Sequence, residues 1–164
     1  ISRGDWFVGK FLGYAIAALG LSALISLPLV LLMPLNGLIW CYSLILELII
    51  VIAAALAFAI TLRQITIALS VVAGFYVLSR SIAGMVLISH GSTIDLSLVS
   101  NQFFASTVEL LASVLPDLDR FTQAAWLVGP VPSGSELLQL TMQSLIYGSL
   151  LASVGLFDLH RREF

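Results

Sequence analysis

Residues 38–62 read LIWCYSLILELIIVIAAALAFAITL, and this run decides the fold class. It contains one charged residue, Glu47, and no proline or glycine. A helix rises 1.5 Å per residue, so about 20 apolar residues cross a hydrocarbon layer about 30 Å thick. The run is long enough to cross a membrane as one helix, and it therefore predicts a span.

Three further stretches have the same character. Residues 11–33 and 137–157 carry no charged side chain, and residues 65–89 carry only Arg80. The chain of 164 residues is 60% hydrophobic and 10% charged, whereas soluble domains have about 25% charged residues. We predict an all-α, polytopic transmembrane helical bundle, a single domain over residues 1–164 with four spans in these ranges. Pro34, Asn36 and Gly37 predict a turn between the first two spans.

Between residues 90 and 135 the chain becomes more polar and gains prolines and glycines. Within it, NQFFASTVELLASVL (residues 101–115) carries apolar residues at the spacing of an amphipathic helix: Phe104, Val108, Leu111 and Leu115. We expect this helix to end at Pro116, and a second short helix, capped by Asp117, to run on through residue 128. Two alternatives stay open for the region. Its helices are interfacial or re-entrant, or they form a hairpin outside the membrane.

The basic residues predict the orientation. If the N-terminus is cytoplasmic, four spans leave only Arg120 on the outer side, while Arg80 lies within a span. The other five basic residues then face the cytoplasm: Arg3, Lys10, Arg63, Arg161 and Arg162. Because cytoplasmic loops are enriched in Lys and Arg, we expect a multi-pass protein of the bacterial inner membrane with both ends of this chain in the cytoplasm.

Glu47 and Arg80 are the charged residues that the spans contain. A charge at the centre of a span costs about 2.5–3.5 kcal/mol or more unless it is compensated. Glu47 precedes the turn at Arg63 by almost as many residues as Arg80 follows it, so the hairpin places both at one depth, in the outer half of the bilayer. We predict an interhelical ion pair, with Ser43, Ser79 and Ser81 as possible neighbours. The pair either lines a transport path or fixes the register of the helices, and Arg80 could instead reach the outer interface.

Small residues recur at four-residue spacing within the spans, which lets helix backbones approach closely. The pairs are Ala53 and Ala57, Ala55 and Ala59, Gly148 and Ala152, and Ser149 and Ser153. They are typical of a subunit interface or of packing within one chain, and the sequence leaves both open.

Residue types that perform chemistry are sparse. The chain has one cysteine, Cys41, and its histidines, His90 and His160, are isolated, so we expect no metal site. It lacks the G-x-x-x-x-G-K-[ST] pattern that binds nucleotide phosphates. No basic stripe indicates a nucleic-acid partner. We expect no catalytic residue and no cofactor on this chain.

Three segments resemble type-2 ATP-binding-cassette (ABC) permeases. Residues 1–15, ISRGDWFVGKFLGYA, resemble the stretch that follows the cytoplasmic coupling helix of that family. The matching residues are Ser2, Arg3, Gly4, Asp5, Gly9, Lys10 and Gly13. Residues 156–164, LFDLHRREF, are similar to the family's cytoplasmic end. Residues 111–129, LASVLPDLDRFTQAAWLVG, resemble its outward-facing Leu-Pro-x-Leu-x-x-Phe segment before the last span.

The resemblance implies a permease subunit of an exporter, which forms the substrate path while a separate ABC ATPase subunit binds and hydrolyses ATP. It also implies a second permease subunit, identical or different. Family members have six spans, so we expect a piece that is truncated before Ile1, with Arg3 and Lys10 flanking the coupling surface and Trp6 at the interface. The alternatives are a non-catalytic scaffold or assembly subunit of a membrane complex, and an intramembrane enzyme.

Overall fold

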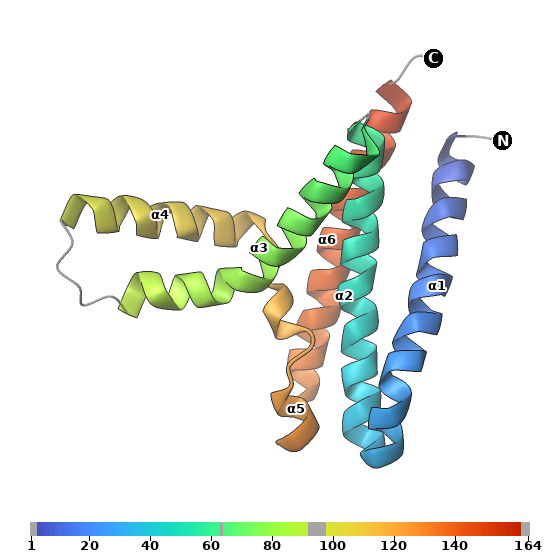
Figure 1. The fold of residues 1–164 in the computed structure, drawn as a ribbon, viewed down its shortest axis with the longest axis vertical. Coiled ribbons are helices and arrows are strands. Elements are labelled where there is room, and N and C mark those ends of the chain that lie inside the picture. Colours follow the sequence, from blue (N-terminus) through green and yellow to red (C-terminus); the bar gives the residue numbers. More distant parts are fainter. Residues whose placement is uncertain (1–2, 63, 92–97, 162–164) are drawn as a thin grey trace.

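The computed structural model describes residues 3–62, 64–91 and 98–161, and every regular element in these ranges is a helix. Four long helices are joined by one helix of intermediate length and two short ones (Figure 1). In chain order these are α1 (Arg3–Leu32), α2 (Pro34–Thr61), α3 (Ile65–Gly91), α4 (Leu98–Val114), the 3-10 helix η1 (Leu118–Arg120), α5 (Ala125–Val128) and α6 (Gly134–Arg161).

Within the described ranges, four helices are long and apolar enough to cross a membrane. They are Gly4–Leu32, Pro34–Thr61, Ile65–Val86 and Gly134–Leu159, with mean hydropathies of 2.4, 2.8, 1.7 and 1.4. Their outer faces are apolar as well, and Leu31 and Leu32 are 76% and 81% exposed. Soluble monomers rarely expose large apolar patches. The predicted all-α bundle of a membrane protein is therefore confirmed.

The turn between α1 and α2 is tighter than predicted. Only Met33 lies between the two helices, and Pro34 is already the first residue of α2. Proline suits that position because its ring fixes a helical φ and the missing N–H needs no partner there. Asn36 and Gly37 lie inside α2, so the part of the predicted turn that includes them is wrong.

The central helix is α2, and α6 runs parallel to it. The Ser144 hydroxyl donates to the Leu46 carbonyl at 3.1 Å, and a Cβ on Gly155 would lie 3.3 Å from the Cα of Ala57. Leu46 faces Ser144, and Ala57 faces Gly155 further along both helices. The two helices therefore run in the same direction, and these contacts define their register. Part of the small-residue spacing thus serves packing within one chain.

The other part of that spacing faces outward. Ser149 and Ser153 are exposed, and their hydroxyls donate to carbonyls of their own helix, at Ile146 and Ser149.

Helix α3 follows α2 for only part of its length. It begins beside the end of α2, where Phe58 and Phe75 meet edge to face at 6.1 Å between ring centroids. Its C-terminal half then leaves the bundle and runs outward beside α4 (Figure 1). The predicted third span, residues 65–89, is thus a helix that does not stay on α2. The two ends of the chain lie at the same end of the bundle (Figure 1).

The chain between α4 and α6 fills the place that α3 leaves. Leu118 and Phe121 are fully buried and pack in one cluster with Leu46, Ile50 and Leu140. Leu46 and Ile50 lie at the middle of α2, so this segment reaches half-way along the most apolar of the candidate spans.

The predicted second short helix differs in form. It is divided into η1 and α5, and Asp117 makes no capping hydrogen bond with its side chain. Instead, Asp117 Oδ2 lies 3.3 Å from Nε of Arg120, while Oδ1 is buried with no hydrogen-bond partner among the described residues. This burial raises the pKa of the Asp117 carboxyl above its ordinary value. At the end of η1, Phe121 enters the core and its carbonyl accepts a bond from Ser43 of α2.

Candidate functional site

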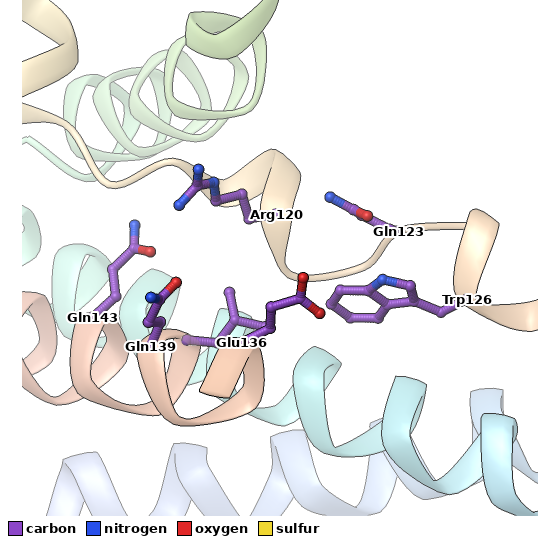
Figure 2. A pocket seen from close by; sticks show the side chains of 7 residues that line it. Arg120, Gln123, Trp126, Glu136, Gln139 and Gln143 are labelled. Atoms are coloured by element: carbon purple, nitrogen blue, oxygen red, sulfur yellow. The ribbon is translucent and has the colours of Figure 1, made fainter. Parts of the chain in front are cut away.

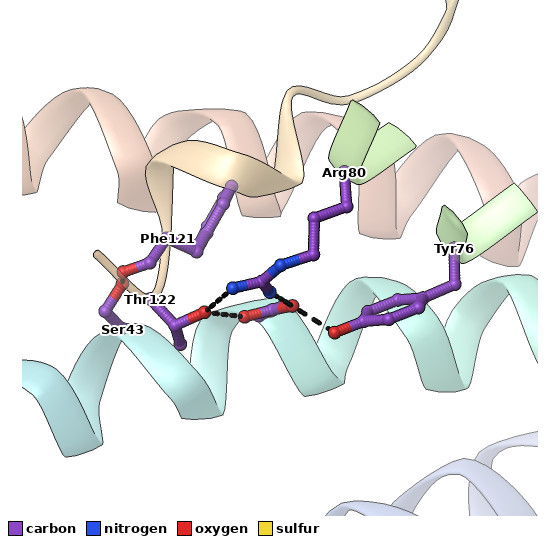
Figure 3. Close-up of polar contacts among 6 residues, drawn as sticks. Ser43, Tyr76, Arg80, Phe121 and Thr122 are labelled. Atoms are coloured by element: carbon purple, nitrogen blue, oxygen red, sulfur yellow. Dashed lines mark hydrogen bonds and ion pairs between the residues drawn. The ribbon is translucent and has the colours of Figure 1, made fainter. Parts of the chain in front are cut away.

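The structure brings Glu47 of α2 and Arg80 of α3 together. Arg80 Nη1 lies 2.7 Å from Glu47 Oε1 (Figure 3). The Glu47 side chain is 3% exposed and that of Arg80 is 35% exposed. Glu47 lies at the middle of α2 (Pro34–Thr61).

A hydroxyl from the segment between α4 and α6 completes a ring of hydrogen bonds. Arg80 Nη2 donates to Thr122 Oγ1 at 2.9 Å, and the Thr122 hydroxyl donates to Glu47 Oε2 at 2.8 Å. Arg80 Nη1 also donates to the Tyr76 hydroxyl at 3.2 Å. Both carboxylate oxygens of Glu47 are therefore occupied, which is what a buried charge requires. We call Glu47, Tyr76, Arg80 and Thr122 the charged ring.

The predicted serine neighbours do not belong to this ring. Ser43 donates to the Phe121 carbonyl, and the buried Ser79 hydroxyl has no hydrogen-bond partner in the described part of the chain. Tyr76 could have been found, because it lies four residues before Arg80 and shares its helix face. Thr122 carries no such signal, since 75 residues separate it from Glu47.

Side chains of the long helices bind the carbonyls of residues 115–128, which we call the crossing segment. Asn36 Nδ2 donates to the Trp126 carbonyl at 2.8 Å, and the Tyr147 hydroxyl donates to that of Leu115 at 3.3 Å. The Ser43 hydroxyl likewise donates to the Phe121 carbonyl. Non-helical backbone at membrane depth is tolerated where protein satisfies its polar groups. These three bonds satisfy the carbonyls of Leu115, Phe121 and Trp126.

The geometry indicates that the ring fastens three elements at one point. Each charge would be costly to bury alone, and a buried ion pair need not add stability over an apolar replacement. Its specific effect is positional, because Thr122 can bond to both partners only when α2, α3 and the crossing segment are in this arrangement. The position of the crossing segment at this site thus depends on the side chains of Glu47, Arg80 and Thr122.

Replacing Thr122 with valine tests this role. The change keeps the shape of the side chain and leaves one carboxylate oxygen and one guanidinium nitrogen without their partner. We expect a loss of about 1–3 kcal/mol in the free energy of unfolding, the cost of unsatisfied buried polar groups. The measurement is denaturation of the protein in detergent micelles, and Thr122→Ser, which keeps the hydroxyl, is the control. Equal stability of both variants would contradict the role of the hydroxyl.

An open groove of about 530 Å³ lies between α2 and α3 beside the ring. Glu47, Tyr76, Arg80 and Thr122 form its polar part. The remaining lining is apolar or aromatic: Trp40, Leu44, Leu48, Val51, Leu69, Val72 and Ala73. The groove therefore offers an apolar wall that ends in an ion pair, a combination that suits an amphiphilic molecule or an apolar side chain.

The other predicted site residues lie elsewhere. Arg3 begins α1, but its side chain is outside the described part, as are Arg63 and Arg162. Lys10 is exposed, and its Nζ lies 5.7 Å from the ring centroid of Trp6, within range of a cation–π interaction. Because both residues are near the N-terminal end of α1, they do not take part in the charged ring.

The described residues contain no group of three His, Cys, Asp or Glu side chains that could hold a metal ion. Comparison of the chain with models of protein families, with curated proteins and with solved structures found no match.

Proposed function

We propose that the chain is the membrane-spanning permease subunit of an ATP-driven exporter of the type-2 ABC class, with ATP hydrolysed on a separate ATPase subunit. The resemblance of residues 1–15, 111–129 and 156–164 supports this proposal. So do the four candidate spans, since such a subunit needs a polytopic bundle and no nucleotide site of its own.

The observation that carries the proposal is the crossing segment seated at the middle of α2. Ionisable residues within spans mark transport pathways, proton relays or other functional sites by default. Broken helices near the bilayer midplane are how many transporters build theirs. We therefore take the crossing segment to be re-entrant and the charged ring to hold it in one of two positions. In this view the pair both fixes helix register and borders the path.

The movement would start at the cytoplasmic end. Closure of the ATPase dimer would pull on the coupling region, whose flank carries Arg3 and Lys10. Helices α2 and α3 would then shift relative to each other, and the ring, which needs both, would open. Release of Thr122 would free the crossing segment and open a path toward the outer face. Two permease subunits, identical or different, would enclose that path in a bacterial inner membrane, with both chain ends in the cytoplasm.

The test uses the full-length protein with its ATPase, reconstituted in lipid nanodiscs. In a background without other cysteines, including Cys41→Ser, a Gln123→Cys variant reports on the crossing segment by its rate of labelling with a water-soluble maleimide. We expect the rate to differ between the nucleotide-free and the ATP-trapped complex. The difference should vanish in Glu47→Gln and in Arg80→Gln, and it should persist in Leu24→Ala, whose side chain is 73% exposed.

The scaffold alternative predicts another outcome. The protein would then purify within a membrane complex that holds no P-loop ATPase, and nucleotide would leave the labelling rate unchanged. Either of these results would overturn the permease proposal.

A further inference from the structure

A second pocket, of about 270 Å³, lies between α6 and the crossing segment (Figure 2). Its lining is unusually rich in carboxamides. The residues are Arg120, Gln123, Trp126, Glu136, Gln139, Leu140 and Gln143. Figure 2 shows the Glu136 carboxylate beside the Trp126 ring, with the side chains of Gln139 and Gln143 on the other side of Glu136. Gln139 and Gln143 belong to a candidate span, where polar side chains are costly unless something polar meets them.

The two charges of the pocket are already engaged by the protein. Arg120 pairs with Asp117, with 3.3 Å between Nε and Oδ2. Glu136 Oε2 accepts the Ser133 N–H at 2.8 Å, and the Ser133 hydroxyl accepts the Glu136 N–H at 3.4 Å. This reciprocal pair is a capping box at the start of α6. These contacts partly neutralise both charges, and they leave the two terminal nitrogens of Arg120 and Oε1 of Glu136 as further polar groups of the pocket.

The remaining polar side chains of the pocket are neutral amides. The side-chain amides of Gln123, Gln139 and Gln143 have no hydrogen-bond partner within the described part of the chain. Each carboxamide offers one acceptor oxygen and two N–H donors. Hydroxyl groups match such a set because each of them both donates and accepts. Trp126 adds an apolar face with one N–H donor, on which the C–H face of a saturated ring can lie.

We propose that this pocket binds a neutral polyhydroxylated ring, that is, a saccharide unit. Its volume lies just below the range of about 300–1,000 Å³ that holds drug-sized ligands, so it fits one ring rather than a chain. The same chemistry is presented by a free sugar and by the headgroup of a glycolipid. The site is separate from the groove beside the charged ring, and the inference does not depend on the proposed transport function.

The experiment measures binding to the full-length protein in nanodiscs of phosphatidylcholine, so that no sugar-based detergent is present. The first arm titrates methyl glucoside and methyl N-acetylglucosaminide and follows binding by isothermal titration calorimetry. The second arm raises the fraction of a monoglucosyl lipid in the nanodisc and follows saturation by the change in tryptophan fluorescence, to which Trp126 of the pocket contributes. Saturation in the first arm identifies a free sugar, and saturation only in the second identifies a headgroup. Both outcomes support the assignment.

Two variants locate the binding. Gln139→Leu and Gln143→Leu should each weaken saccharide binding about tenfold, since each removes hydrogen bonds worth about 1–1.5 kcal/mol. Gln64→Leu makes the same change at an exposed position outside the pocket and should leave binding unchanged. Equal melting temperatures of the three variants exclude misfolding. The assignment is overturned if neither arm saturates, if both pocket variants bind as the parent does, or if a zwitterion such as glycine betaine binds in preference.

Discussion

Replacing Arg80 with glutamine should lower the free energy of unfolding by about 3 kcal/mol or more, because it leaves a buried carboxylate without its counter-charge. Glu47 is only 3% exposed, so its charge cannot reach water without movement of α2. Thr122 would remain as its one strong partner. The reverse change, Glu47→Gln, should cost less. Arg80 is 35% exposed, and its long side chain can turn its guanidinium toward headgroups or solvent.

The measurement is a double-mutant cycle on unfolding in detergent micelles, with Glu47→Gln, Arg80→Gln and the double variant. The double variant should be more stable than Arg80→Gln alone, since no buried charge remains. Arg120→Gln is the matched control, because the Arg120 side chain is 63% exposed and such a pair is worth at most about 1 kcal/mol. The buried-pair interpretation is wrong if Arg80→Gln and Arg120→Gln have the same effect, or if the losses at Glu47 and Arg80 simply add.

A second large effect is expected at Gly37, near the start of α2. A Cβ at this position would lie 2.7 Å from the backbone nitrogen of Val30 and 2.8 Å from the carbonyl carbon of Leu29. These are backbone atoms of α1, so no rotation of a side chain can relieve the overlap. Gly37→Ala should therefore separate α1 from α2 and cost about 1–3 kcal/mol, the range for overpacked sites.

Thermal unfolding in detergent measures this cost, and Gly20→Ala is the control. Gly20 also lies in a long helix, but a Cβ there meets nothing within 4 Å. Alanine is the better helix former by about 0.5–1 kcal/mol, so Gly20→Ala should leave the melting temperature unchanged or raise it. If both glycine variants are equally stable, the close approach of α1 to α2 at Gly37 is refuted.

The ion pair could be predicted from the sequence because its two residues lie almost equally far along the chain from the same turn. Glu47 and Arg80 lie on consecutive helices joined by a short turn, and in such a hairpin depth follows from counting residues. The same count could not anticipate that α3 leaves α2 beyond this point. Its departure depends on Leu118 and Phe121, which take up the face of α2 around Leu46 and Ile50.

The hydrogen-bond partners of the ion pair show which contacts residue spacing cannot predict. Thr122 reaches the pair from a segment that the sequence left open as interfacial, re-entrant or outside the membrane. Ser43 binds a carbonyl of that segment. Likewise, the second pocket is lined by Gln123 from the crossing segment and by Gln139 and Gln143 from α6. No helical or turn spacing relates residues that are so far apart in the chain, so neither arrangement leaves a local pattern.

The sequence by itself determined that the chain is suited to a membrane and how many long apolar helices it forms. Hydropathy adds up residue by residue, so a run such as 38–62 is apolar whatever it later contacts. Tertiary structure alone decided where the polar segment after α4 lies and which groups satisfy its carbonyls. Those bonds form only after helices distant in sequence have packed, because hydrogen bonds require geometry that composition does not contain.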